Sequence, residues 1–305
     1  DIKPGDAVFC PTFTFFATAE VIAFEGATPV FVDSDEATFN ICPIDLEKRI
    51  KQTIDDGKLK PKAIVVVDLF GLPANYPDIE RIANKYNLRV IEDAAQGFGG
   101  SITNAKGVER KAGSFGDIAT TSFFPAKPLG CFGDGGAVFT NNSDLAEKMS
   151  SLRLHGQTKR YYHKYIGMGG RLDALQAAVL NVKLKYYDKD IQERQRVAKT
   201  YSNLLGDNII KPTVDSQKTS VWAQYSIRIK NRGEVQAKLK EQGIPTAVHY
   251  PLPLHLQECF DYLNHKQGDF PISEKVANEI ISLPMNPYLT TEELNYIVEQ
   301  FNSCL

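Results

Sequence analysis

The feature that most restricts the fold is a regular alternation, over the first 140 residues, of short apolar runs with longer amphipathic stretches. The runs are rich in Val, Ile and Phe, and several are apolar throughout, which is typical of strands covered on both faces of a largely parallel sheet. The amphipathic stretches at 15–25, 43–55 and 76–86 predict the intervening helices. The predicted strands occupy residues 7–10, 29–33, 63–69, 89–92, 118–123 and 137–140. This βαβα order predicts a three-layer α/β domain with a mostly parallel sheet.

The pattern changes after Leu172. Apolar residues recur there at helical spacing and a charged stretch follows at 188–196, so the sequence predicts one helix of roughly 30 residues that leads into a second domain. We expect a large domain over residues 1–185 and a smaller α+β domain over 186–305. Within the smaller domain, the predicted strands are 220–229 and 246–250, and the predicted helices are 233–242, 273–283 and 291–301, the last capped by Thr290 or Thr291.

Charge and composition exclude several classes of protein. Lys and Arg number 35 against 37 Asp and Glu, so the basic excess of a typical nucleic-acid-binding protein is absent. A charged fraction of 24%, with apolar residues spread along the chain, excludes a disordered protein. No apolar run approaches the ~18 residues of a membrane span, and the polar start is unlike a signal peptide. The five cysteines include no CxxC pair, which argues against a disulfide framework or a zinc site; we therefore expect a cytoplasmic protein with neither nucleic acid nor membrane as a partner.

Two acids, two alanines and an amide stand at the end of a predicted strand, in the segment EDAAQ at 92–96. In open α/β sheets, ligands bind at the carboxyl ends of the strands. A carboxylate at Asp93 suits a cationic heterocycle nitrogen, and an alanine such as Ala95 can lie flat against a ring. In the alternative interpretation, Glu92 and Asp93 only cap the next turn.

Lys127 stands in a loop between two prolines, after an apolar run and before a glycine cluster at 133–136. A lysine constrained in a pocket loses its proton more easily and forms a Schiff base with a carbonyl; the alternative is an ordinary surface lysine in a turn. The glycine cluster matches neither GxxxxGK[ST] nor a helix-opening GxGxxG. The combination is more specific, because an acid for a pyridine nitrogen and a lysine for an aldehyde are what pyridoxal 5′-phosphate requires.

With the motifs EDAAQ, GDIATTSFFPAK, GDGGAV and RLDALQAAVL in this order, the sequence resembles the DegT/StrS group of sugar-nucleotide aminotransferases over essentially its whole length. The resemblance implies a pyridoxal phosphate enzyme of fold type I, with an aspartate aminotransferase-like large domain. It implies that Lys127 is the Schiff-base lysine, that Asp93 pairs with the pyridine nitrogen, and that Gln96 lies near the phenolic oxygen. Phe15 matches an aromatic residue stacked on the ring, and Ser122 matches a phosphate ligand.

A finer resemblance concerns the substrate. The segments HGQTKRYYH, PTAVHYPLPLH and SLPMNPYL are similar to the branch that aminates C3 of UDP-2-acetamido-2-deoxy-3-keto-glucuronic acid, with glutamate as amino donor, for lipopolysaccharide (O-antigen) and related surface glycans. There the residues that match His249 and Tyr250 contact the sugar, and Arg171 would face its carboxylate from the partner subunit of a homodimer with shared sites. In the alternative interpretation, His249 and Tyr250 are strand residues with satisfied hydrogen bonds, and Arg171 forms a salt bridge at a helix start.

The sequence departs from the family pattern at two places. Gly169 stands where the family usually has an Asn that contacts phosphate or substrate from the neighbouring subunit. Family members also carry a further segment before the residues that match 4–6, and a helix start in that segment holds the cofactor phosphate. The resemblance therefore implies that the N-terminal part of the large domain is missing. It also implies that a chain beginning at Asp1 binds the phosphate incompletely. The alternatives are an aminotransferase for a 4-keto or 3-keto-6-deoxy nucleotide sugar, and a catalytically silent regulatory protein of the same fold.

Overall fold

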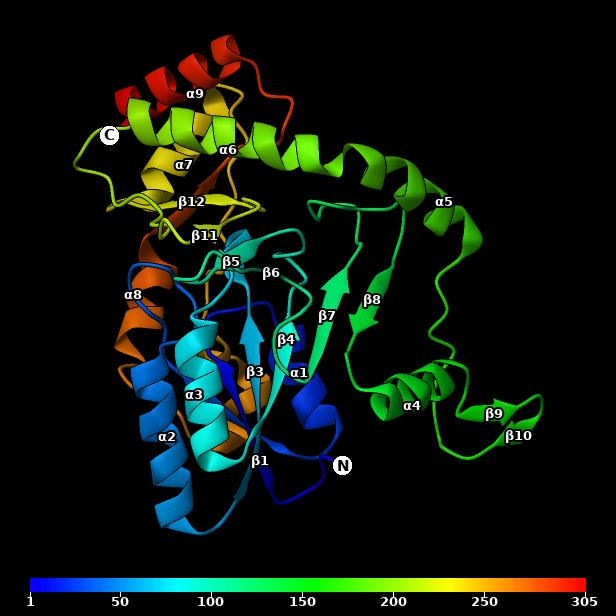
Figure 1. Cartoon of the computed structure of the whole chain (residues 1–305). Coiled ribbons are helices and arrows are strands. Elements are labelled where there is room, and N and C mark those ends of the chain that lie inside the picture. Colours follow the sequence, from blue (N-terminus) through cyan, green and yellow to red (C-terminus); the bar gives the residue numbers. More distant parts are fainter.

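A six-stranded sheet forms the centre of the first half of the chain (Figure 1). The computed structural model describes all 305 residues. The strand order is β2-β1-β3-β4-β7-β8, with every neighbouring pair parallel except β7 and β8. The six strands are β1 (Asp6–Pro11), β2 (Thr28–Val32), β3 (Lys60–Val67), β4 (Arg89–Asp93), β7 (Ile118–Ser122) and β8 (Gly136–Phe139). The predicted α/β fold with a mostly parallel sheet is confirmed, and each predicted strand of the first half is present with small shifts of its ends.

Helices cover this sheet on both faces because alternate strand residues point to opposite sides. Phe9 and Val66 are buried with residues of α2 (Pro43–Asp56) and α3 (Tyr76–Tyr86). Their neighbours Val8 and Val65 are buried on the other face, together with residues of α1 (Ala17–Phe24) and of the segment 254–270. The sheet is therefore the middle of three layers.

The predicted long helix exists, but a 3₁₀ turn interrupts it. It consists of α5 (Ala174–Lys183), η2 (Leu184–Tyr186) and α6 (Tyr187–Leu204). Before it, α4 (Ser143–Arg153) is followed by a short hairpin of β9 (Gln157–Lys159) and β10 (Tyr162–His163), which lies away from the central sheet (Figure 1). At the start of α6, Tyr187 is buried with Phe123, which directly follows β7. Farther along the helix, Val197 and Tyr201 are buried in the second core.

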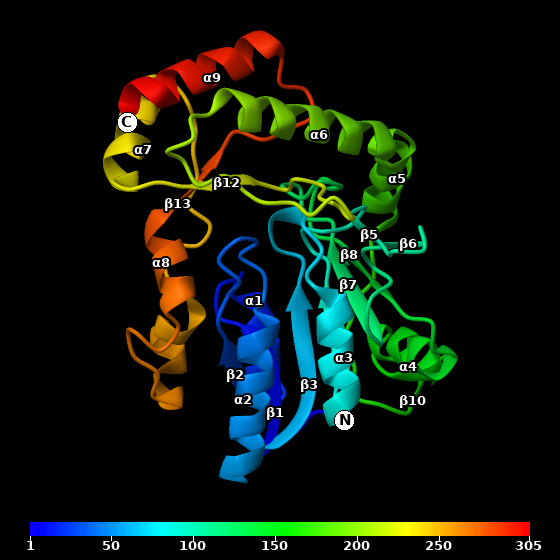
Figure 2. The ribbon, with the colours of Figure 1, turned by 60° about the vertical axis from the view of Figure 1, so that its left-hand side comes forward.

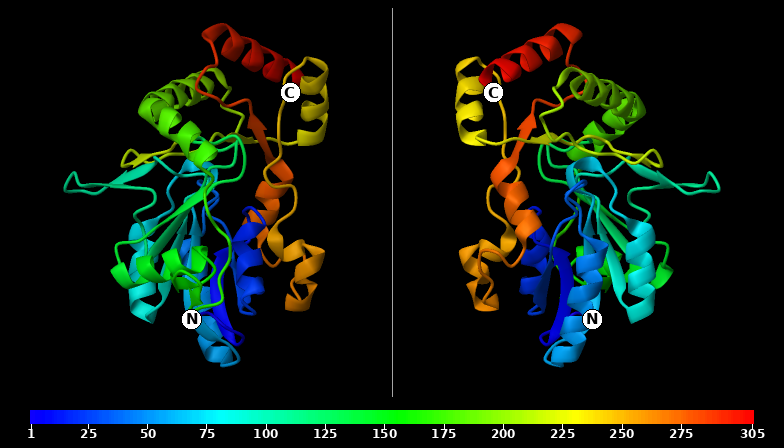
Figure 3. Two further views of the ribbon diagram at one scale, coloured as in Figure 1. Left: turned by 90° about the vertical axis from the view of Figure 1, so that its right-hand side faces the viewer. Right: turned by 90° about the vertical axis from the view of Figure 1, so that its left-hand side faces the viewer.

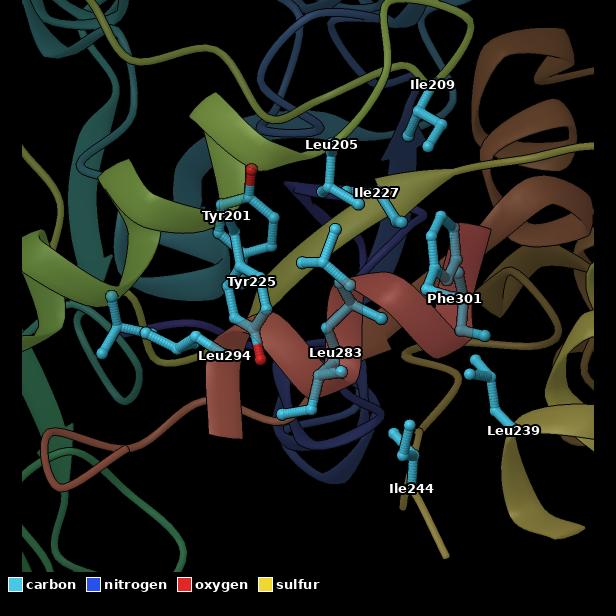
Figure 4. Close-up of a cluster of buried hydrophobic side chains, with 14 of the residues drawn as sticks. Tyr201, Leu205, Ile209, Tyr225, Ile227, Leu239, Ile244, Leu283, Leu294 and Phe301 are labelled. Carbon is cyan, nitrogen blue, oxygen red and sulfur yellow. The ribbon is translucent and has the colours of Figure 1, made fainter. Parts of the chain in front are cut away.

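The second core lies beyond the carboxyl ends of the parallel strands (Figures 1 and 2). It surrounds the antiparallel pair β12 (Tyr225–Arg228) and β13 (Ile280–Leu283) and is closed by α6, α7 (Arg232–Glu241) and α9 (Thr291–Cys304). Figure 4 shows side chains from these elements converging, among them Tyr201, Tyr225 and Phe301. Thr290 caps α9 in a reciprocal capping box with Glu293, which stabilises the helix by roughly 0.5–2 kcal/mol.

Three expectations for the second half differ from the structure. The predicted helix 273–283 ends at Glu279 as α8 (Pro271–Glu279), and β13 follows directly. The reason is tertiary: Ile280, Ile281 and Leu283 are buried and pair with β12, and this packing outweighs local helix propensity. The predicted strand 246–250 is only one bridge, between Ala247 and Ser282, and the strand predicted at 220–229 is shortened to β12.

The remaining elements connect the two cores. A small sheet has the order β11 (Lys218–Thr219), β5 (Ser101–Thr103), β6 (Glu109–Lys111), so the second half of the chain adds a strand to a hairpin of the first. The 3₁₀ turns are η1 (Leu69–Gly71), η3 (Leu254–Leu256) and η4 (Glu258–Leu263). Figure 3 shows α8 and the turns before it beside the central sheet. None of the helices is both long enough and apolar enough to cross a membrane.

Candidate active site

A cavity of about 880 Å³ lies on the α1 face of the sheet and reaches the carboxyl ends of its strands. Val67, Asp93 and Ser122, the last residues of β3, β4 and β7, line it. Every site residue predicted from the sequence except Arg171 lines this one cavity: Phe15, Asp93, Ala95, Gln96, Ser122, Lys127, His249 and Tyr250. The fold therefore assembles residues that are up to 235 positions apart in the chain (250 − 15), as expected for the carboxyl edge of an open α/β sheet.

Asp93 ends β4, between the last residue of β3 and Thr120 of β7. Its Oδ2 accepts a hydrogen bond from the Thr18 hydroxyl at 3.2 Å, and its Oδ1 accepts one from the Ala95 N–H at 3.1 Å. Burial raises the pKa of Asp93, while these two hydrogen bonds and the Lys127 ammonium lower it. The site thus holds a half-buried carboxylate whose charge depends on its partners.

Lys127 lies five residues after β7, and its N–H donates to the carbonyl of Phe124 at 2.8 Å in a tight turn. Burial lowers the pKa of the Lys127 amine, and the Asp93 carboxylate opposes that shift. A lysine with a lowered pKa carries more of its reactive neutral form at neutral pH. The structure therefore supports the constrained-amine interpretation of this residue.

Gln96, Tyr250 and Phe15 form a third group of residues that line the cavity. The Gln96 amide donates from Nε2 to the Tyr250 hydroxyl at 3.0 Å and accepts from the Phe70 N–H at Oε1 (2.6 Å). Tyr250 also lies against the Phe15 ring, with centroids 6.2 Å apart. Burial raises the pKa of Tyr250 to about 12, so the phenol is neutral and remains a hydrogen-bond donor at physiological pH.

The Nδ1 of His249 lies 3.2 Å from the hydroxyl oxygen of Ser282 in β13. The other ring nitrogen, Nε2, takes no part in this contact. Burial and the nearby Lys127 charge lower the pKa of His249, so the imidazole is neutral at physiological pH. Phe15 is 57% exposed, which is unusual for a phenylalanine and leaves ring surface available to a ligand.

Arg171 is exposed just before α5 and does not line the cavity of its own chain. Gly169 forms a single bridge with Leu154, and a Cβ there would lie 3.1 Å from the His155 ring. The structure thus brings the other predicted residues together and places Arg171 elsewhere on the surface.

Glu92, beside Asp93 in the sequence, has a different place. It points to the other side of β4, where its two oxygens accept from the Gly113 and Phe115 N–H groups at 2.6 and 2.7 Å. Asp68 lies next to it, with Oδ1 bonded to the Tyr76 hydroxyl. Burial, followed by the neighbouring carboxylate charge, raises the pKa of Asp68, and burial raises that of Glu92. The pair is a buried acid cluster behind the cavity.

Among the polar cavity residues that were not predicted from the sequence are Thr14, Thr18 and Gln224. Thr18 holds Asp93, and Thr14 bonds to Thr18 at 3.2 Å between hydroxyl oxygens. Their spacing of four residues in PTFTFFATA would put them on one side of a helical turn, and this signal could have found them. Gln224 also lines the cavity, but no local pattern distinguishes it.

The donor set fits pyridoxal phosphate. An amine whose pKa is lowered by burial and a half-buried carboxylate line one cavity, and each influences the charge of the other. Val65, Ile91 and Ala95, from the sheet and the strand end, give the same cavity an apolar lining. A carboxylate, an amine and an apolar floor are the groups that hold a pyridine nitrogen, an aldehyde and an aromatic ring.

Comparison with known proteins decides the family. Residues 1–302 match the family model described as the DegT/DnrJ/EryC1/StrS aminotransferase family. The chain belongs to this family. The resemblance inferred from the sequence motifs is therefore confirmed, and the enzyme is a sugar-nucleotide aminotransferase that depends on pyridoxal phosphate.

Two relatives illustrate the range of names within this family. A pleiotropic regulatory protein of Geobacillus stearothermophilus is 46% identical over 303 residues, which cover 98% of this chain and 78% of that protein. A UDP-2-acetamido-2-deoxy-3-oxo-D-glucuronate aminotransferase of Pseudomonas aeruginosa is 44% identical over 297 residues, which cover 97% of this chain and 79% of that protein.

Solved structures agree with the fold and the cofactor. A DegT DnrJ EryC1 StrS aminotransferase from Brucella abortus is 44% identical, with a TM-score of 0.94 over 99% of this chain and 80% of that one. The NtdA structure from Bacillus subtilis, with bound cofactor PMP, is 30% identical, with a TM-score of 0.87 over 99% of this chain and 68% of that one. PMP is the aminated form of pyridoxal phosphate, which an aminotransferase uses to carry the amino group.

Proposed function

We propose that this enzyme transfers the amino group of L-glutamate to C3 of UDP-2-acetamido-2-deoxy-3-keto-glucuronic acid, in the synthesis of lipopolysaccharide or a related surface glycan. The observation that carries the aminotransferase chemistry is the meeting of Lys127 and Asp93 in one cavity. The choice of substrate is supported by the 44% identical relative with that activity in its name. It is also supported by the His249–Tyr250 pair, which has hydrogen-bonding groups facing the same cavity.

Lys127 acts as the anchoring amine and as the proton carrier. When bound, pyridoxal phosphate acts as an electron sink and carries the amino group between the two substrates. Burial lowers the pKa of the Lys127 amine, which favours the neutral form that takes a proton at Nζ from the amino-bearing carbon of glutamate. In the second half of the cycle, the same Nζ delivers a proton to C3 of the sugar, and its fixed side of the cavity determines the configuration at that carbon.

Asp93 would hold the pyridine nitrogen of the cofactor and keep that nitrogen protonated. The Thr18 hydroxyl and the Ala95 N–H orient the two oxygens and favour the ionised form against the effect of burial. Both ends of the Gln96 amide are held, by Phe70 and by Tyr250, so the amide has a fixed direction at the cavity wall. These contacts make the polar part of the site rigid before any ligand enters.

The remaining assignments concern the sugar nucleotide and the phosphate. In this proposal Phe15 stacks on the ring, Ser122 binds the phosphate, and the neutral His249 and Tyr250 orient the sugar. Arg171 is exposed and does not line its own cavity, so in this proposal it contributes by entering the cavity of a second copy. We therefore include a homodimer with shared sites in the proposal.

The activity is tested with purified enzyme, L-glutamate and the 3-keto sugar nucleotide, with the 3-amino product and 2-oxoglutarate measured by mass spectrometry. We expect turnover with this substrate and at least a 1,000-fold loss, on the order of other lost nucleophiles, in Lys127→Ala. Borohydride reduction should attach the cofactor mass to the peptide that contains Lys127. Faster turnover of a 4-keto or 3-keto-6-deoxy nucleotide sugar would show that this sugar is the substrate instead. No turnover of any of these sugars would favour a regulatory protein.

The shared site is tested by mixing two inactive variants. In a dimer that contains one Lys127→Ala chain and one Arg171→Ala chain, one of the two sites has both native residues. Random exchange of subunits should therefore restore about one quarter of the wild-type activity. If the mixture stays as inactive as its components while subunits exchange, Arg171 does not act across the interface.

A further inference from the structure

Lys127 lies in the connection between β7 and β8, residues 123–135, which contains neither a helix nor a strand. We call these residues the lysine loop. Two backbone hydrogen bonds close the loop at its base: the Phe123 N–H donates to the Gly135 carbonyl at 2.7 Å, and the Cys131 N–H donates to the Phe123 carbonyl at 2.8 Å. A reacting group must be held to within about 0.5 Å, and sites on loops are less precise than sites on helices or strands. The contacts that hold the lysine loop from outside therefore matter for the chemistry.

Helix α5 presents one of its faces to the lysine loop. Gln176, Leu180 and Lys183 are spaced by four and then three residues, which places them on the same side of an α-helix. The middle residue, Leu180, is buried in one cluster with Leu129 and Cys131 of the loop. The apolar contact between helix and loop thus lies between two polar side chains of the helix.

These two polar side chains bind the backbone of the loop. The Gln176 Oε1 accepts a hydrogen bond from the Phe132 N–H at 2.7 Å. The Lys183 Nζ donates one to the Gly130 carbonyl at 2.6 Å. Helix α5 therefore holds the loop at two points, three and five residues after Lys127.

The charge of Lys183 is directed at the loop. Its ammonium lies 5.1 Å from the centroid of the Phe132 ring, and it donates to the Gly130 carbonyl without forming a salt bridge. A hydrogen bond from a charged donor is roughly twice as strong as a neutral one, and a cation over an aromatic ring is also attracted to it. Both interactions of this ammonium are with the lysine loop.

Close packing within the loop connects these contacts to Lys127. A Cβ on Gly130 would lie 2.7 Å from the Pro125 carbonyl oxygen and 2.8 Å from the Phe124 carbonyl oxygen, so the two sides of the loop touch there. The Phe124 carbonyl also accepts the Lys127 N–H at 2.8 Å. A displacement of Gly130 therefore reaches the turn that carries Lys127.

Neither Gln176 nor Lys183 lines the cavity, so each can influence the reaction only through the loop. We propose that Gln176 and Lys183 are positioning residues that fix the lysine loop and, through it, the amine of Lys127. This inference rests on the role given to Lys127 in the function proposed above.

The test removes each contact separately. Gln176→Leu and Lys183→Met lose the acceptor and the donor, and both new residues are good helix formers, so α5 is retained. In the pyridoxal phosphate-loaded enzyme, we expect the rate of the half-reaction at saturating glutamate to fall about 10–100-fold, because a displacement of about 1 Å costs up to that much. The glutamate concentration that gives half the maximal rate should change less than about threefold, since neither residue lines the cavity.

A second measurement uses the cofactor-free protein and does not depend on activity. Burial lowers the pKa of Lys127 in the native loop. A loosened loop exposes the amine to water, so in both variants an amine reagent should begin to modify Lys127 at higher pH than in the wild type, as measured by peptide mapping. A purely structural role of Gln176 and Lys183 would lower the Tm without this change.

Conservative variants and a matched control make the result specific. Gln176→Glu keeps an acceptor and Lys183→Arg keeps a charged donor, so both should retain the half-reaction rate within about threefold of wild type. Lys185→Met alters an exposed lysine two residues beyond Lys183 that has no hydrogen bond to the loop, and it should change neither measurement.

Three results would overturn the inference. The first is a lower Tm with the wild-type rate and the wild-type pH dependence of Lys127 modification. The second is an equal loss of rate in Lys183→Met and Lys183→Arg, because the loss would then not depend on the hydrogen bond. The third is a rate within twofold of wild type in both Gln176→Leu and Lys183→Met.

Failure of the proposed function is recognised separately. In that case the wild-type enzyme transfers no amino group, and borohydride attaches no cofactor to Lys127. The pH dependence of Lys127 modification in the cofactor-free protein then still decides the inference: a shift in both variants supports it, and an unchanged pH dependence overturns it.

Discussion

Replacing Thr18 with valine isolates one hydrogen bond to the carboxylate of the site. Valine has the shape of threonine without the hydroxyl, so Thr18→Val removes the donor to Asp93 Oδ2 and leaves the packing of α1 intact. Asp93 then keeps only the Ala95 N–H and the Lys127 charge against the effect of burial. The variant therefore weakens the charged form of Asp93 without altering Asp93 itself.

The size of the effect follows from the geometry. A hydrogen bond to a charged group is worth about 1.5–3 kcal/mol when it is buried. The lower end applies here, because the oxygens are 3.2 Å apart and Asp93 is only half-buried. A loss of about 1.5 kcal/mol corresponds to a roughly tenfold weaker interaction with any cation that the carboxylate holds.

The assay is the affinity of cofactor-free protein for pyridoxal phosphate, followed by visible absorbance, together with the rate of the glutamate half-reaction. We expect both to fall about tenfold in Thr18→Val, by the magnitude of the lost bond. Thr14→Val is the matched control. It lines the same cavity and touches Thr18 but not Asp93, so its effect should stay within about threefold, as for a neutral hydrogen bond.

Two results would refute this reasoning. If Thr18→Val binds the cofactor within twofold of wild type, the hydroxyl does not sustain the Asp93 charge. If Thr14→Val loses as much as Thr18→Val, the loss reflects disturbance of α1 and not the carboxylate. Thermal unfolding of the cofactor-free variants separates a local effect from loss of structure.

Two further predictions concern pH. Burial lowers the pKa of Lys127, so an amine reagent should begin to modify Lys127 of the cofactor-free protein at lower pH than it modifies an exposed lysine, as measured by peptide mapping. Asp93→Asn removes a charge that favours the ammonium, so it should shift this pH dependence of the modification rate to still lower pH. A pH dependence like that of an exposed lysine would contradict the prediction. The pKa of Asp68 is raised in the folded state. At pH values above the ordinary pKa of Asp, the native protein therefore binds more protons than the unfolded chain. The free energy of unfolding of the wild type should fall as the pH rises through this range. In Asp68→Asn this decrease should be absent. Urea unfolding at pH 5 and pH 7 would then show that the stability of the variant minus that of the wild type grows with pH, and a difference that shrinks with pH would contradict the prediction.

Much of the cavity could be predicted because its residues come in short motifs. Asp93, Ala95 and Gln96 occupy one strand end, and Lys127 follows the next strand in the sheet order, so βαβ topology alone brings them together. Thr18 escaped because its role depends on how α1 is placed beside β4. Gln224 escaped because the lack of a hydrogen-bond partner for its buried Oε1 is visible only when every neighbour is known.

The second half of the chain was harder to predict for a related reason. The run 280–283 suits either a helix end or a strand, and only pairing with β12 makes it a strand. The expected strand at 246–250 lies between Pro245 and Pro251 and forms a single bridge, which leaves His249 and Tyr250 free to face the cavity. In both places, contacts between distant segments decide the local conformation.

The sequence by itself determined the layered α/β fold, the acid and the lysine of the site, and the family, because strand periodicity and the chemistry of single side chains are local properties. The tertiary structure decided which groups hold the charge of Asp93, that Glu92 lies with Asp68 behind the cavity, and which amide is left without a partner. Hydrogen-bond partners and burial depend on the whole set of neighbours, and these neighbours come from segments that only folding brings together.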